Sequence, residues 1–300
     1  MSRVTDTTSP ASTENNDRGG LNLTGQVEES NRLNGSDGDD LIFAALPELA
    51  ASSVTNDVID GGDSDDIIVG FDGNDSLLGG EGNDLIFGNR GDDTLLGNGG
   101  GDVLLAGIGS DRVEAGAGDD MVSGDLGDDV LLGEAGNDLV FGGQGADEID
   151  GGDGGDVLFG GRDSDSIRGG TGNDWIAGDQ GADCLSGGVG SDTFSFNGYG
   201  DPENTVGELG GDTITDFTTG EDKIALDKTV FSAIGDTLEA VEFLKTDNVA
   251  GASSAELIKL IYNPETGELI YNPTAAANDE TIVAQLEGNP DLNLGDFEIL

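Results

Sequence analysis

Aspartate recurs every nine residues through the middle of this chain, within a repeat that is rich in glycine. The stretch "GGEGNDLIF" (Gly79 to Phe87) is followed directly by "GNRGDDTLL", and in both aspartate is sixth and a branched apolar residue eighth. Sixteen consecutive nonads run from Ser52 to Ser195, and one more, Gly35 to Phe43, precedes them across the eight-residue insert 44–51. Position six is aspartate in all seventeen nonads: Asp40, Asp57, Asp66, Asp75, Asp84, Asp93, Asp102, Asp111, Asp120, Asp129, Asp138, Asp147, Asp156, Asp165, Asp174, Asp183 and Asp192. Carboxylates and glycine carbonyls are ligands of a hard cation such as calcium, so the pattern predicts a series of metal sites with these aspartates as ligands.

The other positions of the nonad are restricted as well. Position eight is apolar in all seventeen nonads, from Ile42 to Phe194. Positions one and four are each glycine in fourteen nonads. The departures are Ser52, Ala106 and Ala115 at position one, and Thr55, Ser64 and Asp163 at position four. Glycine permits a tight turn with positive φ and leaves its carbonyl unshielded, so these positions predict turns with exposed carbonyls.

The remaining residues predict the elements that hold the aspartates. The three residues after each aspartate are rich in Val, Ile, Leu and Phe, and they favour a very short strand with position eight inward and positions seven and nine outward. Such strands cannot stand alone, but stacked turns bury the inward row and pair every backbone, which makes a solenoid. A solvated low-complexity linker would have no reason to keep an apolar residue at fixed phase. A solenoid without metal would leave the aspartates repelling one another along two edges.

The nonads strongly resemble those of the repeats-in-toxin (RTX, hemolysin-type) family. The resemblance implies an all-β fold: a parallel β-roll, that is, a right-handed β-solenoid of nonapeptide repeats with two nonads per lap, followed by a C-terminal β-rich cap. It also implies multiple Ca²⁺ ions between loops one lap apart, with ligand partners eighteen residues apart, as Asp66 is from Asp84. The block of sixteen nonads then has at most fourteen sites. We expect fewer, because Asp163 and the departures near the start put the sites that they line in doubt.

Composition excludes several classes of function. The chain has 11 basic and 62 acidic residues, and its net charge of −51 would repel nucleic acid. Histidine is absent and Cys184 is the only cysteine, which excludes histidine-based zinc sites, Ser-His-Asp and Cys-His catalysis, and internal disulfides. No stretch approaches the ~20 apolar residues that a membrane span requires. The polar N-terminus has no apolar segment of the kind found in cleaved signal peptides.

Three segments are expected. They are a disordered N-terminal segment over residues 1–34, an RTX calcium-binding β-roll over 35–198, and a C-terminal cap and type I secretion region over 199–300. Within the last, "GGDTITDFTTGEDKIAL" (210–226) resembles the segment that follows the last turn of the roll in serralysin-type proteins. The stretch "LIYNPETGELIYNP" (260–273) predicts a hairpin around Pro-Glu-Thr-Gly. The ending "LNLGDFEIL" resembles the termini of substrates of type I secretion.

The region after the roll also carries acidic residues. Asp212, Asp216 and Asp222 could hold a further ion, or they could be solvated acidic residues beside strands.

These features predict a non-catalytic protein. Only 34 residues precede the first nonad, too few for the catalytic domain that the family often places before its roll. The resemblance implies a secreted, extracellular protein that leaves the cell through a type I exporter and folds on binding Ca²⁺. The alternatives are a polysaccharide-binding accessory module and a cell-surface or adhesin component. Binding an acidic glycan would need a row of basic residues, and the four arginines of the roll do not form one: Arg90, Arg112, Arg162 and Arg168.

The two outer faces of the predicted roll differ. In one sheet thirteen of the sixteen outward residues at positions seven and nine are apolar, and in the other sheet ten of sixteen are polar. The first set, here named the apolar stripe, comprises Ile67, Val69, Leu85, Phe87, Val103, Leu105, Met121, Ser123, Leu139, Phe141, Val157, Phe159, Trp175, Ala177, Thr193 and Ser195. A contiguous apolar surface of this kind must be covered. Either the C-terminal region folds back over it, or a second copy or a surface partner contacts it. The fold-back would place Leu257, Ile261 or Phe243 on Phe87, Phe141 and Phe159, and the intermolecular contact would use Phe87, Phe141, Phe159 and Trp175.

Overall fold

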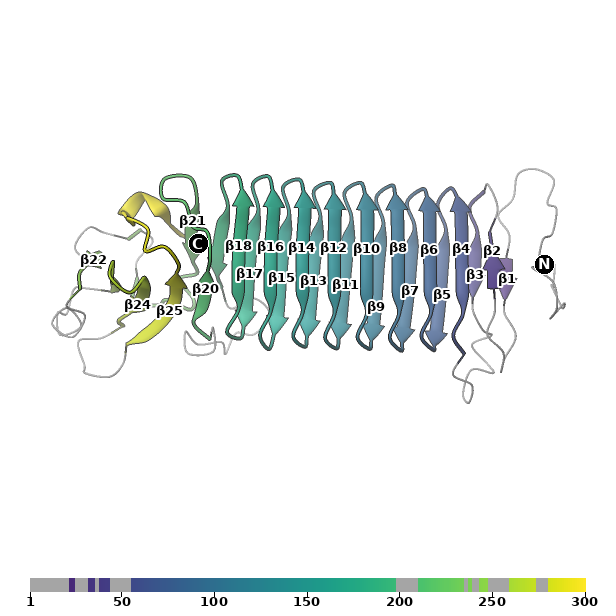
Figure 1. Ribbon diagram of the computed structural model, residues 1–300, viewed down its shortest axis with the longest axis horizontal. Helices are drawn as coiled ribbons and strands as arrows, with labels where there is room; N and C mark the ends of the chain where they lie inside the picture. Colours follow the sequence, from purple (N-terminus) through teal and green to yellow (C-terminus); the bar gives the residue numbers. More distant parts are fainter. Residues whose placement is uncertain are drawn as a thin grey trace. The chain divides into compact units, whose positions relative to one another are not determined.

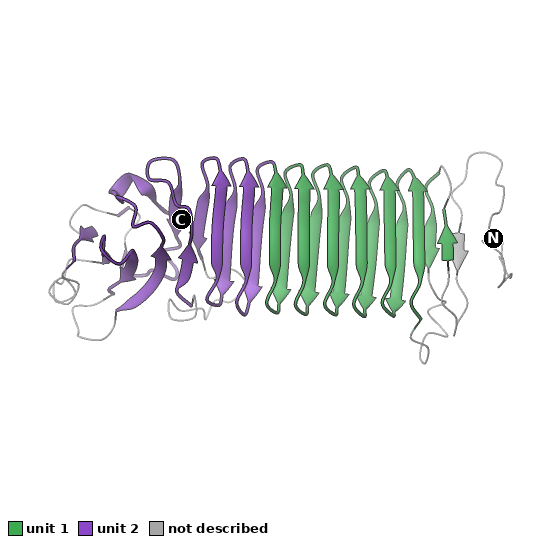
Figure 2. Ribbon diagram, in the orientation of Figure 1, with its two compact units in different colours: residues 1–153 green, residues 154–300 purple. Residues whose placement is uncertain are grey.

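The computed structural model describes residues 22–24, 32–35, 38–43, 55–197, 210–234, 237–238, 243–247, 259–273 and 280–300. The described residues are almost all in strands and turns, and they divide into two compact units, residues 1–153 and 154–300 (Figure 2). The insert 44–51 and Leu257 lie outside the described residues.

In residues 1–153, successive strands alternate between two parallel sheets (Figure 1). One sheet contains β1 (Asn22–Thr24), β3 (Leu41–Phe43), β5 (Ile67–Asp72), β7 (Leu85–Arg90), β9 (Val103–Ile108), β11 (Met121–Leu126) and β13 (Leu139–Gln144). The other contains β2 (Arg32–Asn34), β4 (Val58–Asp63), β6 (Ser76–Glu81), β8 (Thr94–Gly99), β10 (Arg112–Ala117), β12 (Val130–Ala135) and β14 (Glu148–Asp153). From β4 onward the paired residues lie one lap apart, as Ile59 and Leu77 do. The repeat is therefore a parallel β-roll, as the sequence predicted.

The strands are longer than the three residues expected from the sequence. Strands β4 to β14 each have six residues and include positions one to three of the next nonad, as β7 does with Gly88, Asn89 and Arg90. Identical stacking of the laps explains the extension, because a backbone with low strand propensity still pairs when the lap beside it has the same conformation. The ladder skips position one, so that β7 pairs through Phe87 with Leu105 and then through Asn89 with Gly107.

The core of the roll is the row of position-eight side chains. All seventeen are at most 2% exposed: Ile42, Ile59, Ile68, Leu77, Ile86, Leu95, Leu104, Val113, Val122, Leu131, Val140, Ile149, Leu158, Ile167, Ile176, Leu185 and Phe194. The row extends beyond the nonads, because Leu33 of β2 is also buried and pairs with Ile59 of β4. Stacked strands thus begin within the first 34 residues, before the first recognisable nonad.

Residues 154–300 continue the same pattern and then add a different end. One sheet contains β15 (Val157–Arg162), β17 (Trp175–Gln180), β19 (Thr193–Phe196), β21 (Lys223–Leu226) and β26 (Phe297–Ile299), all parallel. The other contains, in spatial order, β16 (Ser166–Thr171), β18 (Cys184–Val189), β20 (Asp212–Ile214), β25 (Thr281–Leu286), β24 (Glu268–Tyr271), β23 (Leu260–Tyr262) and β22 (Phe243–Lys245). Strand β24 is antiparallel to both of its neighbours. The β-rich cap predicted for the C-terminal region is therefore present.

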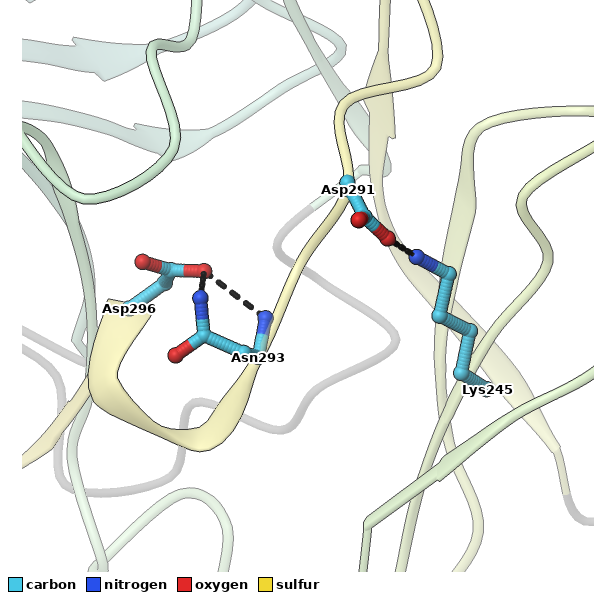
Figure 3. Close-up of polar contacts among 4 residues, drawn as sticks. All are labelled: Lys245, Asp291, Asn293 and Asp296. Atoms are coloured by element: carbon cyan, nitrogen blue, oxygen red, sulfur yellow. Dashed lines mark hydrogen bonds and ion pairs between the residues drawn. The ribbon is translucent and has the colours of Figure 1, made fainter.

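Local polar contacts fix the cap. The predicted hairpin joins β23 to β24 through a turn in which the Asn263 side chain accepts hydrogen bonds from two backbone N–H groups. A short 3-10 helix, η2 (Leu294–Asp296), precedes the last strand. The Asp296 carboxylate accepts hydrogen bonds of 2.8 Å from both the backbone N–H and the side-chain amide of Asn293 (Figure 3). In the same region Lys245 of β22 forms an ion pair with Asp291 (Figure 3).

The apolar stripe lies on the outer face of its sheet, as predicted. Its residues alternate with buried position-eight residues, and most of them are half-buried, with Ile67 at 40% and Met121 at 38% the most exposed. Two residues that were candidates for covering it have partners in the cap itself. Ile261 packs in a cluster with Ile270 and Leu244, and the ring of Phe243 lies 5.1 Å from that of Phe297.

Candidate metal sites

The position-six aspartates lie in the turns at the two edges of the roll, each directly before a strand. All seventeen are buried, with 1–4% of their surface exposed. Because successive nonads turn at opposite edges, an aspartate and the one eighteen residues later lie on the same edge, and the structure brings these pairs together. A buried carboxylate must find partners for its oxygens, so the contacts of each oxygen decide what the site can do.

One carboxylate oxygen ties adjacent laps together. The backbone N–H of Asp66 donates to Oδ1 of Asp84 at 2.8 Å, and that of Asp84 donates to Oδ1 of Asp102 at 2.7 Å. The same bond repeats on the opposite edge, where Asp75 donates to Asp93 at 2.7 Å. It also survives the insert, because Asp40 N–H donates to Oδ1 of Asp66 at 2.6 Å across 26 residues.

The other carboxylate oxygen, Oδ2, is buried and accepts no hydrogen bond in ten of these aspartates. They are Asp66, Asp75, Asp84, Asp93, Asp102, Asp111, Asp120, Asp129, Asp174 and Asp183. A buried carboxylate oxygen without a donor is destabilising, and native structures contain only a few buried polar groups without a partner in every hundred or so residues. A series of them at one position of a repeat indicates a ligand that is not part of the chain.

A backbone carbonyl faces this oxygen from the next lap. A β-carbon placed on Gly61 would lie 2.4 Å from Oδ2 of Asp66 and 2.5 Å from the carbonyl oxygen of Gly79. At Gly88 the corresponding distances are 2.5 Å to Oδ2 of Asp93 and 2.6 Å to the carbonyl oxygen of Ala106. The glycine of position one therefore leaves a space bordered by a carboxylate and a carbonyl oxygen, which are the donors that calcium prefers.

The donor set fits a cation held by few carboxylates and several carbonyls. Within the part of the chain that the structure describes, no three acidic, cysteine or histidine side chains converge on one point. Each gap between laps offers the aspartates of its two loops, and backbone carbonyls must supply the remaining ligands. Such a site suits Ca²⁺, which accepts six to eight oxygens in flexible geometry, better than Mg²⁺, which demands a near-ideal octahedron.

Position four shows why glycine is required in these turns. Gly100 has φ of +132°, and a β-carbon on it would lie 1.7 Å from the carbonyl oxygen of Gly82, one lap earlier. At two of the departures the backbone conformation differs: φ is +80° at Ser64 and +75° at Asp163. The third departure, Thr55, donates its hydroxyl to Oδ2 of Asp57 at 3.0 Å and so occupies the oxygen that accepts no hydrogen bond in the ten aspartates named above.

Burial raises the pKa of several of these carboxyls. The pKa values of Asp66, Asp93 and Asp102 rise from 3.8 to about 7, chiefly because burial disfavours the charged form. The backbone N–H of the preceding lap lowers each pKa, and neighbouring aspartates raise it. A cation in the gap would act in the opposite direction and favour the charged carboxylate.

A second series of hydrogen bonds between laps, which was not predicted from the sequence, lies beside the first. In this series the N–H of the later lap donates to a side chain of the earlier lap, the reverse of the position-six ladder. At position five, Asp65 Oδ1 accepts from the backbone N–H of Asn83 at 2.7 Å, and Asn83 Oδ1 accepts from Gly101 N–H at 2.8 Å. Asp92 accepts likewise from Ser110 N–H at 3.0 Å. The signal available in the sequence was the frequency of Asn and Asp at this position. Side chains at both positions thus link each turn to the laps before and after it.

Two further aspartates continue the position-six ladder beyond the last nonad. Asp212 Oδ1 accepts from Asp183 N–H at 3.1 Å, and Asp222 Oδ1 accepts from Asp192 N–H at 3.0 Å. Both are buried, at 2% and 4% exposure, so of the two interpretations of these residues the solvated one is wrong. The signal was the spacing Asp-x-Ile in "GGDTI" and "GEDKI", which keeps positions six and eight although the nine-residue phase is lost.

Asp216, the third acidic residue noted after the roll, has another role. Its carboxylate accepts from the Ser186 hydroxyl at 2.7 Å and from the backbone N–H groups of Gly187 and Gly188 at 3.0 and 2.9 Å. These contacts fasten the segment after the roll to β18.

Fold and turn geometry define a β-roll with carboxylate-lined gaps between its laps, and the family comparison agrees. The profile described as "RTX calcium-binding nonapeptide repeat (4 copies)" matches residues 28–45, 54–70, 69–104, 96–131, 105–140, 123–158, 132–167 and 159–194, together more than half of the chain. The chain belongs to this family of RTX calcium-binding repeat proteins. No curated protein matches it. Among the described residues, no helix has the length and apolar character of a membrane span.

The raised pKa values predict how the chain responds to pH in chelator. A carboxyl whose pKa is higher in the folded than in the unfolded chain stabilises the fold fully below 3.8, and this contribution is lost as pH rises through about 7. We therefore expect the β signal in far-UV circular dichroism to increase as pH falls from about 7.5 to 5 in chelator. In calcium the trend should reverse, because protons compete with the cation for the same oxygens.

The pH should be kept above the isoelectric point of about 4.1 throughout the titration, because loss of net charge near that pH favours aggregation. A β signal that stays flat or falls with decreasing pH in chelator would contradict this account of the buried carboxyls.

Proposed function

We propose that this RTX-repeat protein is an exported, non-catalytic protein whose roll folds when Ca²⁺ binds between stacked turns, with position-six aspartates as ligands. The observation that supports it best is the row of buried Oδ2 atoms without hydrogen-bond donors, six of which lie close to a carbonyl oxygen of the next lap. The absence of histidine and the single cysteine support the non-catalytic part.

Energetics make calcium a plausible folding switch for such a chain. A ligand that binds only the folded state stabilises it by RT ln(1 + [L]/Kd) per site, so many weak sites sum to a large effect. Extracellular calcium modules have Kd values of about 10⁻⁴ to 10⁻³ M. With a net charge of −51, the chain would remain unfolded in low-calcium cytosol and fold in millimolar calcium outside the cell.

The direct test is circular dichroism of the full chain at neutral pH, first in chelator and then with millimolar calcium. We expect a largely unfolded spectrum that becomes β-rich on addition of calcium and reverts on chelation. A β spectrum that is the same in chelator and in calcium would refute calcium-dependent folding.

A matched pair of variants locates the effect in the gaps between laps. Asp93→Asn replaces Oδ2 with an amide that can donate to the facing carbonyl oxygen of Ala106. It should stabilise the chain in chelator and weaken calcium binding. Its neighbour Asp92 is exposed and accepts from Ser110 N–H, so Asp92→Asn should change both properties little. Equal effects of the two substitutions would argue against position six as the ligand.

Export through a type I exporter is proposed from the C-terminal ending. The segment "DFEIL" comprises the last residue of η2, strand β26 and Leu300, and β26 pairs with β21 in the cap. Deleting the last sixty or so residues should trap the protein inside cells that carry a type I exporter, whereas deleting residues 1–20 should leave secretion intact. Undiminished secretion of the C-terminal deletion, measured by immunoblot of medium and cells, would refute this part of the proposal.

The apolar stripe supports a further proposal, contact with a second copy or with a surface partner. Phe87 and Leu105 are adjacent on the outer face of their sheet and half-buried. Phe87→Asp with Leu105→Asp should abolish self-association in calcium, measured by analytical ultracentrifugation. Leu78→Asp with Leu96→Asp, an adjacent pair on the outer face of the other sheet, is the matched control. A wild-type protein that stays monomeric at high concentration would exclude self-association and leave only a foreign partner.

A further inference from the structure

Asp179 differs from the other residues at position two of the nonad. Six non-glycine residues occupy this position with φ between 65° and 79°: Phe71, Asn89, Asn98, Asp125, Glu134 and Asp179. The polar members are exposed, except Asp179, whose Oδ1 is buried and accepts no hydrogen bond. A carboxylate in a left-handed backbone conformation, with a buried oxygen that has no donor, is doubly unfavourable unless something compensates for it.

The turn that follows Asp179 holds a second oxygen of the same kind. Asp183 is 2% exposed, and its Oδ2 is buried without a donor. A β-carbon on Gly178 would lie 2.2 Å from this oxygen, so Oδ2 of Asp183 points at the residue directly before Asp179. Two aspartates that flank one turn therefore each have a buried carboxylate oxygen without a donor.

The next loop on this edge adds a third carboxylate. Asp212 is 2% exposed, and its Oδ1 accepts from the backbone N–H of Asp183. Gly210 stacks so closely on the turn below that a β-carbon on it would overlap the carbonyl oxygen of Gly181, 1.0 Å away. The segment 210–212 thus forms the upper side of the gap in which Oδ2 of Asp183 lies.

We infer that Asp179 is an additional ligand of a calcium ion held between the turn of Asp183 and the loop of Asp212, which gives this gap three carboxylates. The inference rests on the proposed function, and it adds a residue that the nonapeptide pattern does not assign to metal. A greater number of anionic ligands increases the affinity of a calcium site. This gap, where the last nonad turn on its edge meets the cap, would therefore bind more tightly than gaps lined by two carboxylates.

Electrostatics within the group agree with the geometry. Burial and the neighbouring Asp183 raise the pKa of Asp179 to about 7, and burial, Asp183 and Asp179 raise that of Asp212 to about 9. The three carboxyls therefore repel one another when charged, which a divalent cation relieves. Because no three acidic side chains of the described residues already converge on one point, the Asp179 carboxylate must turn about its side-chain bonds to join the site.

A purely structural role for Asp179 predicts the opposite sign. If it bound nothing, Asp179→Gly would relieve the left-handed strain and remove a buried carboxylate, and so would stabilise the protein under all conditions. If Asp179 is a ligand, it stabilises the calcium-bound protein. Both Asp179→Gly and the nearly isosteric Asp179→Asn then lower the stability of the protein in calcium.

The experiment compares full-length wild type, Asp179→Asn, Asp179→Gly and Asp125→Gly by calcium titration calorimetry and by thermal unfolding in millimolar calcium. Asp125 is the matched control, because it is an aspartate at position two with φ of 71° but is exposed. We expect the Asp179 variants to lose about tenfold or more in affinity at the tightest site and to unfold at lower temperature. Asp125→Gly should retain wild-type affinity.

Two outcomes would overturn the inference, and they differ in what else they affect. If wild type binds calcium but the Asp179 variants bind it equally well or unfold at higher temperature, only the role of Asp179 fails. If wild type itself binds no calcium, the proposed function fails with it.

Discussion

A buried carboxylate shared between adjacent laps is the interaction on which this structure depends. In Asp93, for example, one oxygen accepts from the backbone N–H of the preceding lap, and the other borders the same space as a carbonyl oxygen of the following lap. The first contact fixes the register at eighteen residues, because any slip would remove a hydrogen bond from every buried turn. The second places the negative charge of the carboxylate beside a carbonyl oxygen, where no group of the chain neutralises it. The same residue that aligns the laps therefore also makes their stacking depend on a cation.

The glycines and the narrow core follow from that constraint. Laps close enough for an aspartate to bridge them leave no space for a side chain at position four in the usual backbone conformation, as the overlap at Gly100 with the carbonyl of Gly82 shows, and Ser64 and Asp163 are accommodated with a smaller φ. The interior is correspondingly narrow, and one apolar side chain per nonad fills it. At Asp222 the pattern of the ladder changes. Its carboxylate accepts from Asp192 N–H on one oxygen and from Thr218 N–H on the other, and its own backbone N–H donates to the carbonyl oxygen of Thr218 and not to a later aspartate.

Most of the roll could be predicted because every lap has the same local physics. A fixed phase of aspartate, glycine and apolar residue predicted the buried row, and the family resemblance implied the lap of two nonads and the pairing of Asp66 with Asp84. The sequence was less informative where the same geometry is built from other residues. Leu33 joins the core without a nonad around it, and Asp212 and Asp222 hold ladder positions after the nine-residue phase has ended. Their roles depend on which strands lie beside them, and the nine-residue periodicity of the sequence does not reveal this. The buried Oδ1 of Asp179 could not be foreseen either, because Asp125 occupies the same repeat position and is exposed.

The alternation of nonads between two sheets makes the chain sensitive to parity. Gain or loss of eighteen residues adds or removes one whole lap, and every later residue keeps its edge and its face. Gain or loss of nine residues would move every later nonad to the opposite sheet, while leaving each turn and each buried apolar residue locally intact. The outward apolar residues would then be divided between two faces instead of forming one row. Duplication during the evolution of such a chain can therefore change its length freely in even steps, whereas an odd step rearranges its surface without disturbing its core.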